Sequence, residues 1–127
     1  MDASDRELLD LARKIIEQRY RENQHQIGAA LRTKSGKVFT AVHLEATVGR
    51  IAVCAEAVAL GMAAAAGDTE IETIVAVDAA GQVVSPCGMC RELISDYSPS
   101  AQVIVPAGGK TEVVPVAELL PNKYRPD

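Results

Sequence analysis

Two short stretches, Cys54-Ala55-Glu56 and Pro86-Cys87-Gly88-Met89-Cys90, contain all three cysteines of the chain. Three thiolates supply three soft ligands for one zinc ion. A structural zinc site is normally closed by four protein ligands, whereas a catalytic site keeps three and leaves the fourth position to water. Glu56 follows the first cysteine by two residues and so brings a carboxylate close to that open position. The pattern predicts a catalytic Zn²⁺ site in which Glu56 moves protons.

Both stretches lie near predicted helix starts. We expect one helix over residues 51–66, with Cys54 in its first turns. We expect another from Ser85-Pro86 to about Tyr97, with the serine as N-cap and Pro86 at the first helical position. The partial positive charge of a helix N-terminus lowers the pKa of a thiol and favours the thiolate. Two such N-termini directed at one point would help to neutralise a site of three thiolates.

Other interpretations of these residues remain open. The cysteines have two alternatives, inert packing in the core and a redox pair of Cys87 and Cys90, which would leave Cys54 unexplained. Glu56 lies in an otherwise apolar segment, residues 52–60. A carboxylate is rarely buried without a partner or a task. The alternative is a surface position on an amphipathic helix, and the alanines and valines on both sides count against it.

Helices and strands alternate along the chain. Ser4 and Glu7 have the spacing of a capping box, which predicts a helix from about Asp5 to Tyr20. Val83-Val84 is expected to be extended, and residues 116–120 a short final helix. Apolar runs predict strands at residues 27–33, 37–44, 71–77, 103–105 and 112–114. We therefore expect an α/β fold of three layers, α/β/α, in which helices cover both faces of a five-stranded mixed sheet.

Composition limits the classes of partner. The 127 residues carry a formal net charge of −4 and are 48% apolar, typical of one globular domain spanning residues 1–127. Basic residues do not cluster and aromatic residues are scarce, so we expect no nucleic-acid partner. The longest apolar run, residues 51–67, is interrupted by Glu56, so we expect no membrane span. An odd number of cysteines and an acidic N-terminus without a signal peptide predict a cytoplasmic protein.

Beyond these patterns, the chain resembles the cytidine deaminase superfamily, in its small three-cysteine branch. Residues 27–31, I-G-A-A-L, match the V-G-A-A-L strand of that family, and residues 35–40 match the entry to its next strand. The spacing from Ile27 to Glu56 fits cytidine deaminases without a gap. Residues 60–67, 118–121 and Tyr124 are more similar to blasticidin S deaminase.

The resemblance implies a zinc-dependent hydrolase that converts the amino group of a cytosine nucleoside, or of a similar compound, to a carbonyl and releases ammonia. Glu56 would be the general acid and base, and Ala55 would contact the substrate. Pro86, which would not bind the metal itself, would hold the neighbouring ligand Cys87 in place. The resemblance also implies a homotetramer or a dimer. The metal ligands would be Cys54, Cys87 and Cys90.

Several positions depart from the family pattern. Cytidine deaminases bind the ribose with an N-x-E motif, whereas this chain has His43-Leu44-Glu45. Glu45 is in place to accept a sugar hydroxyl, and His43 either donates a hydrogen bond to the substrate or faces solvent at a strand end. His25 occupies a position where the family commonly has a phenylalanine that packs on the base; it either contributes to the site or is a solvated loop residue.

Two arginines complete the predicted site. Arg50, four residues before Cys54, is expected to face an anionic group of the substrate, to balance the thiolates or to lie at a subunit interface. The arginine that often follows the catalytic glutamate is replaced by Ala57. Arg91, directly after Cys90, is therefore the candidate to support the ligands from outside. The sequence leaves the exact substrate open. Two alternative functions also remain: deamination of a different amino-heterocycle, and a non-catalytic zinc site whose fourth ligand is His43 or Glu56.

Overall fold

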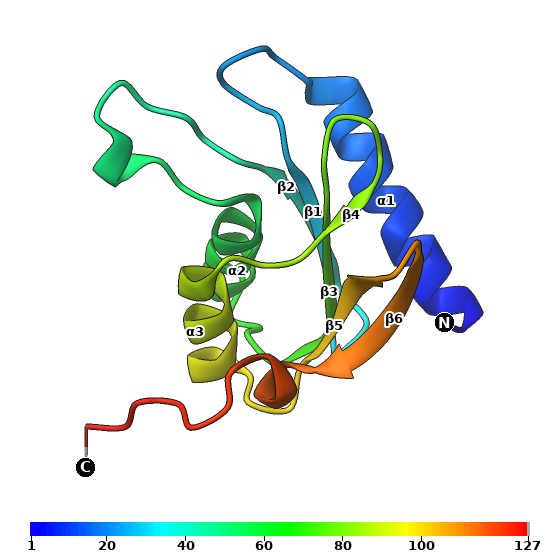
Figure 1. The fold of residues 1–127 in the computed structure, drawn as a ribbon, viewed down its shortest axis with the longest axis vertical. Helices are drawn as coiled ribbons and strands as arrows, with labels where there is room; N and C mark the ends of the chain where they lie inside the picture. The colour runs from blue at the N-terminus through cyan, green and yellow to red at the C-terminus, as the bar shows by residue number, and fades with distance from the viewer. Residues whose placement is uncertain (127) are drawn as a thin grey trace.

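The computed structural model describes residues 1–126, with helices on both sides of one sheet (Figure 1). No helix formed by these residues combines the length and the apolar character needed to span a membrane. The elements in chain order are α1 (Ala3–Arg19), β1 (Gly28–Thr33), β2 (Val38–Val42), the 3₁₀ turn η1 (Gly49–Ile51), α2 (Ala55–Ala65), β3 (Ile71–Val77), β4 (Val83–Val84), α3 (Gly88–Tyr97), β5 (Gln102–Ala107), β6 (Lys110–Pro115) and the 3₁₀ turn η2 (Val116–Leu119).

The sheet is mixed, as predicted, and has the order β2-β1-β3-β5-β6. Only β3 and β5 pair in parallel; the other pairs are antiparallel. The short strand β4 is a sixth strand where five were expected, because the turn after β3 folds Val83-Val84 back onto Ala76 and Val77. The predicted last helix, residues 116–120, is the shorter 3₁₀ turn η2.

Two apolar layers confirm the α/β/α arrangement. On one face of the sheet, α2 and α3 bury Leu60 and Ile94 against Ile74 of the central strand β3. On the other face, α1 buries Leu8 and Ile16 with Val75 and Val77 of the same strand. Successive residues of a strand point to opposite faces. Strand β3 can therefore be apolar along most of its length, since helices cover both of its sides (Figure 1).

Helix α1 begins earlier than the capping-box spacing indicated. Asp2 is the N-cap, and its carboxylate accepts the backbone N–H of Asp5 at 2.9 Å. The hydroxyl of Ser4 donates to the same carboxylate at 2.8 Å instead of capping the helix. The capping box of Ser4 and Glu7 is therefore wrong. Aspartate caps helices as well as serine does, and capping at Asp2 adds helical residues at the N-terminus.

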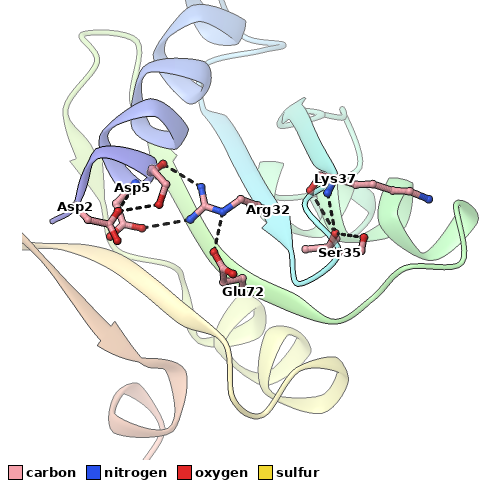
Figure 2. Close-up of polar contacts among 8 residues, drawn as sticks. Asp2, Asp5, Arg32, Ser35, Lys37 and Glu72 are labelled. Carbon is pink, nitrogen blue, oxygen red and sulfur yellow. Dashed lines mark hydrogen bonds and ion pairs between the residues drawn. The ribbon is translucent and has the colours of Figure 1, made fainter.

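Arg32 on β1 attaches the start of α1 to the sheet (Figure 2). Its guanidinium donates to Glu72 on β3 at 2.8 Å and to the carbonyl of Ser4 at 2.9 Å. It also pairs with Asp5 at 3.4 Å, and the side chains of Arg32 and Asp5 are 15% and 12% exposed. At the same end of β1, just past Arg32, the turn through Ser35 and Lys37 is closed by hydrogen bonds with the Thr33 hydroxyl (Figure 2).

Gly28 on β1 lies directly against α1, where the absence of a side chain lets the helix and the strand pack closely. A Cβ atom at this position would lie 2.7 Å from the carbonyl oxygen of Ala12 and 2.8 Å from Cβ of Ile16. Contacts this short are not tolerated between a Cβ atom and backbone, so a side chain here would push α1 away from β1. The glycine of the I-G-A-A-L strand is thus explained by packing within the chain.

Gly28→Ala is expected to lower the free energy of unfolding by about 1–3 kcal/mol, the usual cost of overpacking a well-filled core. Urea denaturation followed by circular dichroism measures the change. Gly61→Ala on α2 is the matched control, because nothing within the subunit lies within 4 Å of a Cβ at that position. Alanine favours a helix over glycine, so the control is expected to be neutral or stabilising. Equal stability of Gly28→Ala and the native chain would contradict the packing role of Gly28.

Candidate active site

Cys54 is the N-cap residue of α2. The predicted helix start at Ile51 is wrong, because residues 49–51 form the separate turn η1. Val53 pairs with Leu44 through two backbone hydrogen bonds of 2.9 Å, which hold the chain extended up to the cysteine. This pairing closes the loop of residues 45–52 at its base and fixes Cys54 at the edge of the sheet.

Cys87 is the N-cap residue of α3, which begins at Gly88. The predicted start at Ser85-Pro86 is wrong as well: the chain stays extended after β4, and the Ser85 hydroxyl accepts a hydrogen bond from Arg91 instead of capping the helix. Cys90 lies in the first turn of α3 and is buried. Two of the three cysteines are therefore N-caps, which directs the N-termini of α2 and α3 toward one place.

The three thiols converge as the sequence predicted. Their sulfur atoms lie within 4.8 Å of one another, and Cys54 Sγ is 3.5 Å from Cys87 Sγ. In a tetrahedral site with Zn–S distances of about 2.3 Å, neighbouring sulfurs are about 3.8 Å apart. Within residues 1–126 this is the one group of at least three histidine, cysteine or acidic side chains placed to hold a metal ion. The donor set fits Zn²⁺ with one position left over.

The environment of the thiols differs between the two helix starts. Burial raises the pKa of Cys54 and, more strongly, that of Cys90. Burial acts the same way on Cys87, but the backbone N–H groups of Cys90 and Met89, with the thiols of Cys54 and Cys90, outweigh it and hold the pKa of Cys87 below its usual value. The thiol pKa that we predicted to fall at a helix N-terminus is therefore lowered at Cys87, whereas the prediction is wrong for Cys54 and Cys90. A bound cation would favour all three thiolates.

Glu56 is buried, with 6% of its surface exposed, in the first turn of α2. The alternative of a surface position is therefore wrong. Burial raises the pKa of the Glu56 carboxyl. Burial makes the carboxylate of Glu56 a stronger base than an exposed one, which suits a group that accepts a proton and returns it.

A pocket of about 380 Å³ opens beside the thiols and Glu56. Its volume is in the range of small-molecule sites. It brings together six of the predicted residues: His43, Glu45, Cys54, Ala55, Glu56 and Cys87. It also includes residues that sequence reasoning did not assign to the site, among them Ile27, Val84, Ser85 and Met89. Met89 lies between the two cysteines of the Cys-x-x-Cys pattern, so the sequence could have indicated its place in the pocket. For Ile27 and Val84 the sequence predicts extended chain and nothing that would mark them as pocket residues.

Two predicted pocket residues do not line it in this chain. Arg50 is exposed on η1, next to the lining residue Gly49. His25 lies behind His43, and its Nδ1 atom is 2.9 Å from the His43 carbonyl oxygen. His43 itself faces the pocket, with a side chain that is 13% exposed, so the alternative of a solvent-facing strand end does not describe it.

Arg91 supports the loop that leads into Cys87. Its guanidinium donates to the carbonyl of Pro86 at 2.9 Å, to the Ser85 hydroxyl at 2.9 Å and to the carbonyl of Leu119 at 3.0 Å. These contacts join the ligand loop to η2 near the end of the chain. All three acceptors are neutral, so they leave the positive charge of Arg91 uncompensated close to the thiols.

The site and the fold have counterparts among known proteins. The family model described as the cytidine and deoxycytidylate deaminase zinc-binding region matches residues 2–106. The chain belongs to this deaminase family. It is 48% identical to the blasticidin-S deaminase of Bacillus cereus over 94% of this chain and 91% of that protein. It is 30% identical to the cytidine deaminase of Halalkalibacterium halodurans over 80% of this chain and 79% of that protein.

Solved cytidine deaminases share the fold. The enzyme of Mycobacterium leprae superposes with a TM-score of 0.83 at 26% identity, over 95% of this chain and all of that chain. The enzyme of Burkholderia pseudomallei gives 0.77 at 27% identity, over 98% of this chain and all of that chain. This deaminase is thus a zinc-dependent hydrolase of the cytosine-nucleoside class, and the cluster of Cys54, Cys87 and Cys90 is compatible with its metal.

The deaminase is expected to hold one zinc ion per chain through Cys54, Cys87 and Cys90. Cys87→Ala removes one of three thiolates and should lower zinc affinity by more than the roughly 10- to 100-fold that changes outside the ligand shell cost. Elemental analysis after dialysis against a weak chelator measures the metal. Met89→Leu is the matched control, because Met89 lies between Cys87 and Cys90 in the first turn of α3 but is 76% exposed. Full zinc retention by Cys87→Ala would rule out the assignment.

Proposed function

We propose that this deaminase converts blasticidin S, a cytosine nucleoside, to its deaminated form. The observation that supports the proposal most is a pocket that joins three thiols, a buried carboxyl group and the pair His43 and Glu45. The chain is 48% identical to a blasticidin-S deaminase and 28–33% identical to the cytidine deaminases compared with it. His43 in place of the asparagine of N-x-E further supports a substrate other than plain cytidine. We also propose that residues 1–127 form one deaminase domain.

The reaction exchanges the C4 amino group of the cytosine ring for oxygen. A C4–O bond forms from water, the C4–N bond breaks, and ammonia leaves. Cys54, Cys87 and Cys90 would hold Zn²⁺, which would supply a Lewis acid that lowers the pKa of water. Glu56 would accept one proton of the attacking water on a carboxylate oxygen and pass it to ring N3. It would then move the remaining proton of that oxygen, now bound to C4, to the leaving amino group, so that the C4 carbonyl and ammonia form.

The remaining pocket residues place the substrate. Ala55 follows Cys54 at the first position of α2 and lines the pocket beside Glu56. Glu45 accepts a hydrogen bond from a polar group of the substrate's sugar, and His43 donates a hydrogen bond to the sugar. Ile27 and Val84 add apolar surface to the same wall. Arg50 lies next to the lining residue Gly49 and is proposed to face an anionic group of the substrate.

A homotetramer is the proposed assembly. Leu44, Val48 and Ile51, in and beside loop 45–52, are 44%, 52% and 66% exposed. Apolar side chains grouped in this way are typical of surfaces that another protein covers. Light scattering of the purified protein measures the assembly, and a monomer at all concentrations would contradict it.

The cytoplasm is the proposed compartment. The three thiols are free, and a reducing compartment keeps them available as ligands. Cell fractionation tests this proposal, and recovery of the protein outside the cytoplasm would contradict it.

Glu56→Gln is expected to keep zinc and fold but to lose activity by several orders of magnitude. A single general acid–base step typically contributes about 10²–10⁴-fold, and Glu56 serves two proton transfers. Ammonia release from blasticidin S measures activity, and elemental analysis measures zinc. Glu17→Gln is the control, because Glu17 is exposed on α1 at the opposite face of the sheet. Native turnover in Glu56→Gln would show that another group moves the protons.

Substrate choice is tested by ammonia release from blasticidin S, cytidine, deoxycytidine, cytosine and other amino-heterocycles. Blasticidin S is expected to be the best substrate, and His43→Asn should gain on cytidine because it restores the N-x-E motif. Glu45→Ala should lose about 5- to 150-fold in kcat/KM on the best substrate, since an unpaired polar contact costs about 1–3 kcal/mol. Cytidine turnover near the diffusion limit, or a neutral Glu45→Ala, would contradict this account of the pocket.

A further inference from the structure

Lys123, in the segment that follows η2, is held against α3 by its ammonium group. The side chain is 12% exposed, although lysine is rarely buried. Its Nζ atom donates to the Ser95 hydroxyl at 3.0 Å and to the carboxylate of Asp96, and it lies 3.8 Å from the carboxylate of Glu92. Residues 92, 95 and 96 share one face of the helix. The three N–H donors of the ammonium group thus meet three acceptors on one side of α3.

The same C-terminal segment begins at a contact with Arg91. The carbonyl of Leu119 accepts a hydrogen bond from the Arg91 guanidinium at 3.0 Å. The guanidinium also donates to the carbonyl of Pro86 and to the hydroxyl of Ser85, both at 2.9 Å. These two residues directly precede Cys87. One arginine side chain therefore contacts both the loop before a metal ligand and the C-terminal segment.

A short turn, residues 120–122, joins these two attachments to α3. Asn122 in this turn has a φ of +55°, in the left-handed region that asparagine tolerates better than most residues. Figure 1 shows the segment after η2 running beside the end of α3. Leu119 packs against the apolar layer of α2 and α3, and Lys123 is fixed on α3 itself. If Lys123 leaves α3, the carbonyl of Leu119 loses a restraint that keeps it directed at Arg91.

We propose that Lys123 is a positioning residue for the metal-ligand loop. By fixing the C-terminal segment on α3, it holds the carbonyl of Leu119 against Arg91. Arg91 in turn holds the chain directly before Cys87. Residues that orient metal ligands from outside the ligand shell affect both metal affinity and activity. The inference goes beyond the proposed function, because the state of the metal site does not depend on which nucleoside is the substrate.

Zinc release measures the role of Lys123. Lys123→Met keeps an unbranched side chain but removes the three N–H donors. The zinc-loaded variant is expected to release its metal to a chromogenic chelator about 10-fold faster than the native protein. This is the lower end of the effect of residues outside the ligand shell, because Lys123 acts through Arg91. Lys14→Met is the matched control, since Lys14 is exposed on α1 at the opposite face of the sheet. Native release by Lys123→Met would overturn the proposal.

A spectroscopic measurement separates positioning from stability. Co²⁺ bound in place of zinc gives visible absorption bands that change with the geometry of its thiolate ligands. Lys123→Met is expected to change these bands, and Lys14→Met is expected to leave them as they are. A lower free energy of unfolding in urea, with an unchanged Co²⁺ spectrum and native zinc release, would show that Lys123 only stabilises the chain end.

Two further variants test the route from Lys123 to the metal site. Asp96→Ala removes an acceptor on the α3 side and is the deciding variant if Lys123→Met does not fold. It should also release zinc faster, and native release would contradict the attachment. In an Arg91→Met background, Lys123→Met should change the release rate by about 2-fold or less, because both residues lie in one chain of contacts. Fully multiplicative effects of the two substitutions would show that Lys123 does not act through Arg91 and would overturn the proposal.

Activity separates failure of this inference from failure of the proposed function. With zinc in excess, Lys123→Met is expected to lower kcat for ammonia release from blasticidin S by about 10-fold. KM should stay unchanged, because Lys123 does not line the pocket at the thiols. A raised KM with native kcat would place Lys123 in substrate binding and overturn its positioning role. If blasticidin S is not deaminated while zinc release and the Co²⁺ spectrum change as expected, the inference stands and the proposed substrate is wrong.

Discussion

The structure depends on the meeting of two helix N-termini at one point. Cys54 and Cys87 are the N-caps of α2 and α3, and Cys90 follows within the first turn of α3. A metal ion bound by all three thiols requires both helices to start at the same end of the sheet and on the same face. The buried layer of Leu60, Ile74 and Ile94 holds them there. The partial positive charges of the two N-termini also offset the negative charge of a three-thiolate site.

The opposite face of the sheet gives this arrangement its rigidity. Helix α1 packs closely against β1 because Gly28 has no side chain, and Arg32 ties the start of the helix to β1 and β3. None of these residues lines the pocket at the thiols. The two faces of the sheet therefore differ. The face covered by α1 contains packing and ion-pair contacts, and the face covered by α2 and α3 contains the thiols and Glu56.

The pocket residue His43 is held at the edge of the sheet, where residues 25–27 run beside the end of β2. Backbone N–H groups of Gln26 and Ile27 donate to Nδ1 of His43, so the neutral ring carries its proton on Nε2. Main-chain groups of a neighbouring segment thus select the tautomer of this side chain.

From the sequence alone one could predict that Cys54, Cys87 and Cys90 converge, that Glu56 is buried and that the fold is of the α/β/α class, because cysteine spacing and apolar periodicity are local properties of the chain. It also placed His43 and Glu45 at the site through their position between a strand and the first cysteine. It did not indicate the helix starts at Ala3, Ala55 and Gly88. Asp2 caps the first helix in place of Ser4, and pairing of Val53 with Leu44 and the contact of Arg91 with Ser85 override the local signals at the other two. Three features became visible only in the folded chain: β4 joins the sheet, His25 lies behind His43, and Arg91 joins the loop before Cys87 to η2. Each of these depends on hydrogen bonds between residues far apart in the chain or on backbone groups that no sequence pattern marks.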